Sequence, residues 1–194
     1  MVEFGKSARR AWEESGQPPM GAFATPAACT AAAYGYRGDV AAADDWMSHA
    51  YSLSSRDLEQ RCGVVMYGID LELHRGRFGE AAALGAESVT GSQWTATYAC
   101  TRAEAFVRAG GGDAMEAIAW AEPRVGQDRY ARAILLRAKG LHASDEALLR
   151  ESKQLFEEME CPFQAARTGW LIGGADRRQA QETFEGLGAT MPAD

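Results

Sequence analysis

Cysteine is sparse in this chain, and no two cysteines form a C-x-x-C pair. The absence of that pair excludes a zinc knuckle and a dithiol redox motif. Four thiols in 194 residues are also too low a cysteine density for a disulfide framework in a chain of this size. We interpret them as buried or half-buried thiols of a cytoplasmic protein: Cys29, Cys62, Cys100 and Cys161.

Positively charged residues are also fewer than negatively charged ones. The chain has 20 Lys and Arg residues against 27 Asp and Glu residues, a net charge of −7. This balance gives no general attraction to nucleic acid or to an anionic membrane. No run approaches the roughly 18 apolar residues of a membrane span, and the first six residues carry charge without an apolar signal core. We therefore expect a cytoplasmic protein without nucleic acid or membrane partners.

Motifs for catalysis and cofactor binding are missing as well. No G-x-x-x-x-G-K-[ST] loop occurs, and Gly110-Gly-Gly-Asp-Ala lacks the Lys and Ser/Thr that phosphate binding needs. No serine lies in a G-x-S-x-G context. None of the three histidines has a second His or a Cys at metal-binding spacing. We expect a non-catalytic protein without a metal or another cofactor.

Strand patterns are absent, whereas alanine is abundant and β-branched residues are few, which favours an all-α fold. A short helix is predicted over Phe4–Ser15, and two prolines mark a loop over 16–21. The rest divides into helical pairs with short connections. The predicted pairs are Thr25–Tyr36 with Val40–Ser52, Ser55–His74 with Phe78–Val89, Trp94–Ala109 with Asp113–Glu122, Asp128–Lys139 with Ser144–Met159, and Phe163–Ile172 with Asp176–Leu187.

Glycine turns recur along the chain at intervals typical of helical-hairpin repeats. The steps between them are 38, 34, 30 and 33 residues. They predict a right-handed superhelical array of about five degenerate hairpins in one domain over residues 22–188, preceded by an N-terminal helix and loop (1–21) and followed by a frayed tail (189–194). The turns are marked by Gly38, Gly76, Gly110, Gly140 and Gly173.

Three segments resemble the turn and second helix of tetratricopeptide repeats: Gly38-Asp-Val-Ala-Ala-Ala, Gly76-Arg-Phe-Gly-Glu-Ala-Ala and Gly112-Asp-Ala-Met-Glu-Ala-Ile-Ala-Trp-Ala. Some of the family's aromatic positions hold Ala or Leu here, so the repeats are degenerate. The last third is similar to the C-terminal repeat region of large bacterial regulators, namely ATP-dependent LuxR-type activators related to the maltose regulator, and cyclase-linked regulators with an ATPase module. That likeness depends on Tyr130-Ala-Arg-Ala-Ile-Leu-Leu-Arg-Ala-Lys-Gly, Ala147-Leu-Leu-Arg-Glu-Ser-Lys-Gln-Leu-Phe-Glu and Cys161-Pro-Phe-Gln-Ala-Ala-Arg-Thr.

In those regulators this region resembles a sensor or scaffold arm. The resemblance therefore implies an arm that senses a ligand or a protein and passes the signal to neighbouring domains. No phosphate-binding loop precedes the array in this chain, and no basic helix-turn-helix follows it. The ATPase and DNA-binding functions are not carried over. We interpret the chain as an excised arm or a stand-alone relative.

The first helix of each pair is expected to line the concave side of such an array. Residues one helical turn apart then share its inner face. Acids fall in the middle of this groove and arginines toward its C-terminal half, a mixture that suits a peptide or a polar small molecule; the alternative is an ordinary solvated helix face. The predicted groove residues are Tyr36, Met66, Asp70, His74, Cys100, Glu104, Arg108, Tyr130, Arg137, Phe163, Arg167 and Trp170.

The function favoured by these features is a non-catalytic binding scaffold, the sensing arm of a bacterial transcriptional or signalling regulator. Its partners would be a protein or peptide, or a small polar ligand, together with neighbouring domains of a larger regulator. An architectural self-association module that forms a homodimer is the alternative. An all-α enzyme has the least support, since no nucleophile, metal or acid–base set is present in the sequence.

Overall fold

The computed structural model describes residues 2–16, 21–54, 57–87 and 92–193. Within these ranges the chain consists of α-helices, one 3-10 turn (Gly21–Phe23) and short connections, so the all-α prediction is confirmed. The α-helices are α1 (Val2–Glu14), α2 (Ala24–Tyr36), α3 (Val40–Ser54), α4 (Leu58–His74), α5 (Phe78–Gly85), α6 (Thr95–Ala109), α7 (Ala114–Val125), α8 (Arg129–Ala143), α9 (Glu146–Glu158), α10 (Pro162–Ile172) and α11 (Gly174–Leu187).

Each predicted helix corresponds to one observed helix. The predicted ends at Ser55 and Val89, and the two prolines of the 16–21 loop, lie outside the described residues. No helix in the described ranges combines the length and the apolar character that a bilayer span requires.

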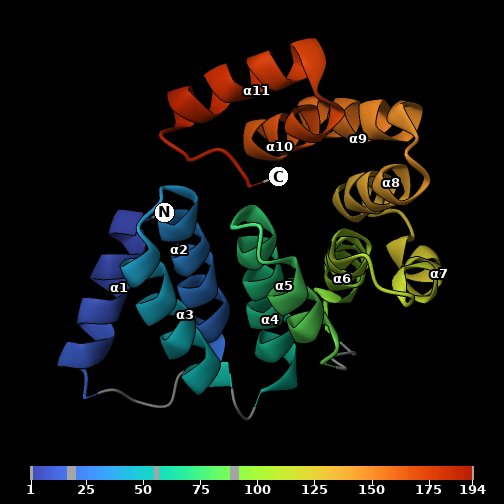
Figure 1. Cartoon of the computed structure of the whole chain (residues 1–194). Coiled ribbons are helices and arrows are strands. Elements are labelled where there is room, and N and C mark those ends of the chain that lie inside the picture. The colour runs from blue at the N-terminus through green and yellow to red at the C-terminus, as the bar shows by residue number, and fades with distance from the viewer. Residues whose placement is uncertain (1, 17–20, 55–56, 88–91, 194) are drawn as a thin grey trace.

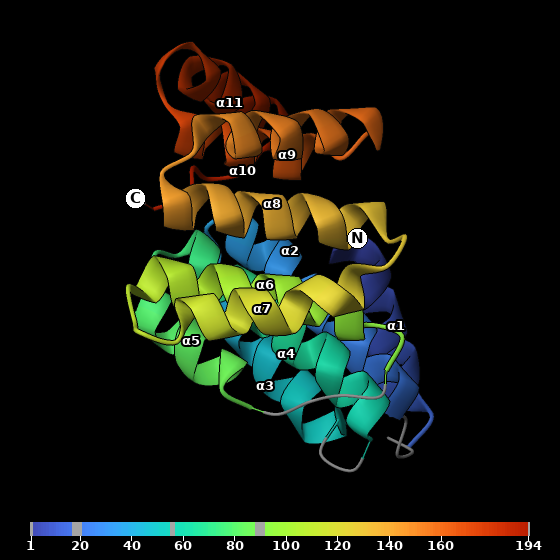
Figure 2. The same cartoon turned by 90° about the vertical axis from the view of Figure 1, so that its right-hand side faces the viewer.

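Consecutive helices pack as pairs: α2 with α3, α4 with α5, α6 with α7, α8 with α9, and α10 with α11. The first helices α2, α4, α6 and α8 also pack against one another in that order and follow a curve (Figure 1). Figure 2 shows α8 between the layer of α6 and α7 and the layer of α9 and α10. Beyond α8 the packing changes, since α10 lies chiefly against α9 and α11.

Small residues allow the helices to approach closely. Alanines at these contacts are buried in both the first and the second helices of the pairs. Gly35 of α2 faces Leu71 and Ala43, and a Cβ at this glycine would lie 2.2 Å from Leu71 Cδ1. The packed alanines are Ala31, Ala43, Ala81, Ala103, Ala117, Ala133 and Ala166.

The fourth predicted turn is wrong. Gly38, Gly76, Gly110 and Gly173 have positive φ, but Gly140 lies inside α8, which continues to Ala143. The left-handed residue is Ser144 (φ 52°), where the predicted helix begins, and the N-cap of α9 is Asp145. Gly140 instead allows close packing, because a Cβ there would lie 2.9 Å from Leu149. With Ser144 as the turn, the second and third steps are both 34 residues.

The segment after α11 returns to the beginning of the array (Figure 1). Thr190 N–H donates to the carbonyl of Tyr36 (2.7 Å), and Ala193 N–H donates to the carbonyl of His74 (3.0 Å). Tyr36 and His74 end α2 and α4 and precede the turn glycines Gly38 and Gly76 by the same two positions. Residues 189–193, for which fraying is expected from composition, therefore contact two neighbouring helical pairs in the same way.

Candidate functional site

Two adjoining cavities lie on the side of the first helices. The larger has a volume of about 520 Å³ and the smaller about 220 Å³. They share four lining residues from α4, α8 and α10: Tyr67, Asp70, Tyr130 and Gln164. The larger cavity is further lined by Ala33, Tyr36, Arg37, Cys161, Pro162, Phe163, Leu187 and Ala189, and the smaller by Met66, Trp94, Thr97, Thr101 and Ile134.

An aromatic cluster joins the two ends of the array beside the larger cavity. The Tyr36 ring lies 4.4 Å from the Phe163 ring and 5.0 Å from the His74 ring, between centroids. Phe163 in turn contacts Phe184 of α11 (5.6 Å). The Tyr36 hydroxyl donates to the Asp70 carboxylate. The cavity wall is thus built from residues that are more than a hundred positions apart.

A buried network of four charges lies behind this wall. Arg137 of α8 donates to Glu104 of α6 through Nη2 (2.7 Å) and Nε (3.0 Å). Arg167 of α10 contacts Glu104 at 3.5 Å and also donates to Asp70 of α4. The fully buried Arg137 further donates to Gln164 Oε1 (2.8 Å). Two positive charges therefore balance two negative charges across four helices.

The protonation states of the site follow from burial and from these charges. Burial disfavours the Asp70 carboxylate, but the charge of Arg167 and the Tyr36 hydrogen bond outweigh it and hold the pKa of Asp70 below its ordinary value. Burial lowers the pKa of His74 to about 4, with a further contribution from Arg167. Burial also raises the pKa of the Tyr130 phenol. At neutral pH the site contains an ionised Asp70, a neutral His74 and a protonated Tyr130.

Five of the predicted groove residues line the cavities: Tyr36, Met66, Asp70, Tyr130 and Phe163. Three others, Glu104, Arg137 and Arg167, are brought together in the buried network rather than exposed in a groove. Their charges are satisfied by one another, since the low dielectric of the interior makes an unpaired charge costly.

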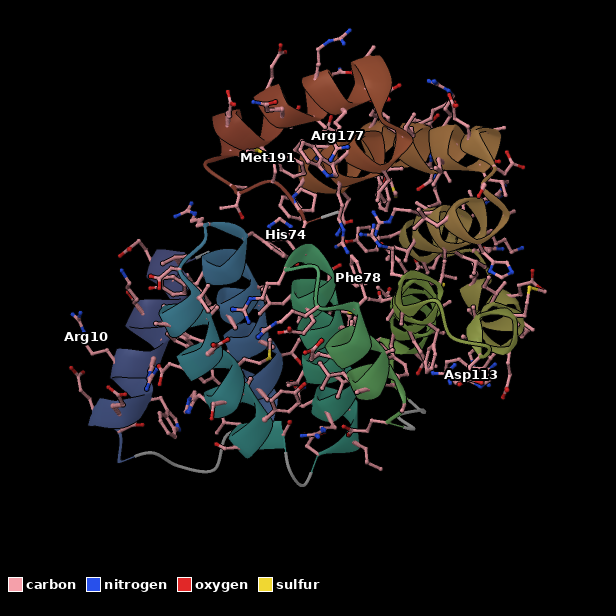
Figure 3. All side chains as sticks on the ribbon, in the orientation of Figure 1. Arg10, His74, Phe78, Asp113, Arg177 and Met191 are labelled. Carbon is pink, nitrogen blue, oxygen red and sulfur yellow. The ribbon has the colours of Figure 1, made fainter. Side chains whose placement is uncertain are left out.

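The remaining four predicted groove residues lie elsewhere. Cys100 is buried in the core around α6, α7 and α8. His74 lies at the end of α4, where its Nε2 is 3.0 Å from Thr190 Oγ1; Figure 3 labels it together with Met191 of the tail. Arg108 lies over the ring of Phe78 (4.1 Å). Trp170 is half-buried and has Arg177 over its ring (3.9 Å).

Sequence reasoning missed several cavity residues. Tyr67 lies three positions before Asp70 on the same face of α4. The predicted face did not include it, because that face contained only residues four positions apart, beginning at Met66. Gln164 directly follows Phe163, and its amide gave no charge or aromatic signal. The other missed residues are Ala33, Arg37, Trp94, Thr97, Thr101, Ile134, Cys161, Pro162, Leu187 and Ala189.

Within the described ranges, no three His, Cys, Asp or Glu side chains gather as they would around a metal ion. The polar groups at the junction of the cavities are two phenols, a carboxylate and an amide. These groups can orient a ligand by hydrogen bonding. Comparisons with protein-family models, with curated proteins and with solved structures found no match to this chain.

Proposed function

We propose that this chain is a non-catalytic binding module built as a right-handed array of degenerate tetratricopeptide-like hairpins. Support comes from the pairing of consecutive helices and from the ordered packing of α2, α4, α6 and α8. The positive φ of Gly38, Gly76 and Gly110 at equivalent turns agrees with a repeat origin. In this proposal the first helices carry the binding face and their partners support it.

The single observation that carries the binding function is the pair of adjoining cavities. Their walls take residues from all five first helices and from the segment around Leu187 and Ala189. A volume of about 520 Å³ lies within the usual range for small-molecule sites. A ligand here would contact α2 and α4 on one side and α10 on the other. Its binding would therefore stabilise the closure of the array between its two ends.

This coupling suits a sensing arm of a bacterial transcriptional or signalling regulator. A ligand that binds only the closed arrangement shifts the population toward it. The helices that present surfaces to neighbouring domains would then change their relative positions. The ligand thus acts through the geometry of the array and needs no chemical step.

A cavity-filling substitution tests the binding function. Ala33 of α2 is half-buried and lines the larger cavity, so Ala33→Phe occupies part of its volume. We expect naphthalene compounds to bind the native chain in isothermal titration calorimetry and to bind Ala33→Phe at least tenfold more weakly. Ala41→Phe, at an exposed alanine of α3, is the matched control. Equal affinity of all three proteins would rule out the cavity as the binding site.

Self-association remains a second candidate because of Phe4. This residue lies on α1, at the end of the array, with 69% of its surface exposed (Figure 1). Aromatic residues are enriched at protein interfaces relative to the rest of the protein surface. If α1 pairs two copies, sedimentation velocity will show a concentration-dependent dimer that Phe4→Ser abolishes. A monomer at every concentration would exclude this function.

A further inference from the structure

The wall of the larger cavity is mostly carbon. The rings of Tyr36, Tyr67, Tyr130 and Phe163 surround it, and aliphatic groups from α2, from the end of α11 and from the segment after it complete it. Aromatic walls favour a flat apolar body, through area burial and ring stacking. The body of a ligand that enters this cavity is therefore apolar and, by shape, aromatic.

The charges next to this wall are already matched. One oxygen of Asp70 accepts from Arg167 and the other accepts from Tyr36, so both carboxylate oxygens have partners. The guanidinium of Arg137 is bound to Glu104 and to Gln164. A charged ligand group at this depth would have to break one of these contacts. The free-energy cost of breaking it exceeds the stabilisation by a new ion pair with the ligand. The deep part of the cavity thus disfavours both ammonium and carboxylate groups.

Apart from the Asp70 carboxylate, whose two oxygens are already paired, the polar groups at the junction with the smaller cavity are neutral. Burial raises the pKa of both the Tyr67 and Tyr130 phenols, so they remain protonated donors at neutral pH. The carbonyl oxygen of Gln164 accepts from Arg137, which leaves its amide nitrogen as the group presented to a ligand. A neutral oxygen or nitrogen acceptor on the ligand body fits this junction.

One cationic side chain lies at the edge of the larger cavity. Arg37 follows the last residue of α2 and is exposed, and no other Lys or Arg is found among the described residues that line the two cavities. The Arg37 guanidinium has no ion pair and no side-chain hydrogen bond within the described part of the chain. A fixed fork of five N–H donors at a cavity mouth matches a carboxylate.

We infer that the cavity takes an aromatic monocarboxylate, with its ring against the rings of Tyr36, Tyr130 and Phe163 and its carboxylate on Arg37. This inference rests on the proposed binding function and names the class of ligand. The apolar body supplies most of the affinity, and the exposed ion pair supplies the discrimination between a carboxylate and a neutral group. The site therefore orders the three ligand types as carboxylate, then amide, then ammonium.

Three compounds with one ring system test this order: 2-naphthoate, 2-naphthamide and 2-naphthylmethylammonium. We expect calorimetry at low salt to show naphthoate binding to the full chain about fivefold more tightly than the amide, as an exposed ion pair allows. The preference will shrink as salt rises. Arg37→Gln will remove it and leave the affinity for the amide unchanged. Arg10→Gln, an exposed arginine on α1 far from the cavity, changes the net charge equally and will retain the preference (Figure 3).

The remaining outcomes separate this inference from the proposed function. If the amide or the ammonium binds as tightly as naphthoate, or if Arg37→Gln keeps the preference, the carboxylate inference is overturned. If Ala33→Phe blocks the compounds in that case, the binding function still stands. If none of the three compounds binds, both the inference and the binding site are rejected.

Discussion

Arg167 of α10 donates a hydrogen bond to Asp70 of α4, 97 residues earlier in the chain. This contact joins the last helical pair to the second pair across the inner side of the array. The same guanidinium reaches Glu104, which is bound to Arg137, so the pair belongs to one buried network. The contacts that close the array are therefore also the contacts that pair its buried charges.

Removal of one member of this network should be strongly destabilising. Arg137→Met leaves Glu104 buried without its principal partner, and we expect the free energy of unfolding to fall by about 3–5 kcal/mol. The double variant with Glu104→Gln should recover part of this loss, since it removes the orphaned charge. Urea denaturation followed by circular dichroism measures both.

Arg132 provides the matched control on the same helix. It pairs with Glu151 at 3.0 Å, and both side chains are exposed. Arg132→Met should therefore cost less than about 1 kcal/mol. Similar losses for Arg132→Met and Arg137→Met would contradict the role assigned to the buried network.

His74 should make the stability depend on pH. A histidine in an unfolded chain has a pKa of about 6.5, whereas burial lowers the pKa of His74 to about 4 in the folded chain and Arg167 adds to this effect. The unfolded chain therefore binds a proton that the folded chain does not, and stability falls as pH decreases from about 6.5 to about 4. The full difference is on the order of 3 kcal/mol.

Denaturation curves of the native chain and of His74→Gln across this pH range give the contribution of His74 to the pH dependence of stability. Carboxylates such as Asp70 also lose stabilising charge in acid, but they do so in both proteins. We expect the variant to show a shallower decline. His142→Gln, at an exposed histidine of α8, should follow the native chain. Parallel curves for all three proteins would remove His74 as the cause.

Alanine substitutions at two turn glycines distinguish the cost of backbone strain from the cost of displacing the tail. Gly76 (φ +73°) and Gly110 (φ +70°) have nearly the same conformation, so alanine at either one costs about 1 kcal/mol of strain. A Cβ at Gly76 would also lie 2.5 Å from Ala193 Cβ, whereas nothing lies within 4 Å of one at Gly110. Gly76→Ala should therefore displace the tail as well.

Amide hydrogen exchange shows the displacement directly. The Ala193 amide, which donates to the His74 carbonyl, should exchange faster in Gly76→Ala and at its native rate in Gly110→Ala. Gly76→Ala should also be the less stable of the two variants. Unchanged protection of Ala193 in Gly76→Ala would show that the tail contact tolerates the added methyl group.

The four thiols should divide into two classes. Cys62 and Cys100 are buried, and burial raises their pKa values to about 11 and about 12, so little thiolate is available for reaction. Cys29 and Cys161 are half-buried, and Cys161 lines the larger cavity. A disulfide reagent should modify two thiols in the folded chain and four in urea. Rapid reaction of all four thiols in the folded chain would refute this division. In the Cys29→Ser variant, naphthoate should slow the reaction of Cys161.

Local features of the fold were predictable because they depend on local physics. Alanine-rich segments without β-branched runs favour helices, and glycine at Gly38, Gly76 and Gly110 favours the left-handed turn that ends a helix. Gly140 misled the prediction because glycine serves two purposes. The absence of a side chain can permit a positive φ, or it can permit close packing. At Gly140 it permits close packing against Leu149. A single sequence does not distinguish the two.

The inner face was predictable to the same degree. Periodicity identified Tyr36, Met66, Asp70, Tyr130 and Phe163, which line the cavities. It also assigned Glu104, Arg137 and Arg167 to an open groove, whereas the structure shows these three side chains buried and in contact with one another. Residues that share a face point in the same direction outward from the helix axis, and that direction does not specify what packs against them.

The sequence by itself therefore determined the helices, most of the turns and the faces that meet on the inner side. Only the tertiary structure decided which residues of those faces remain open to a ligand. That decision depends on the change of packing at α10, which brings Arg167 onto Asp70 and the 189–193 segment onto α2 and α4. Helix formation depends on neighbours within about one turn, whereas the closure of the array depends on contacts across some hundred residues.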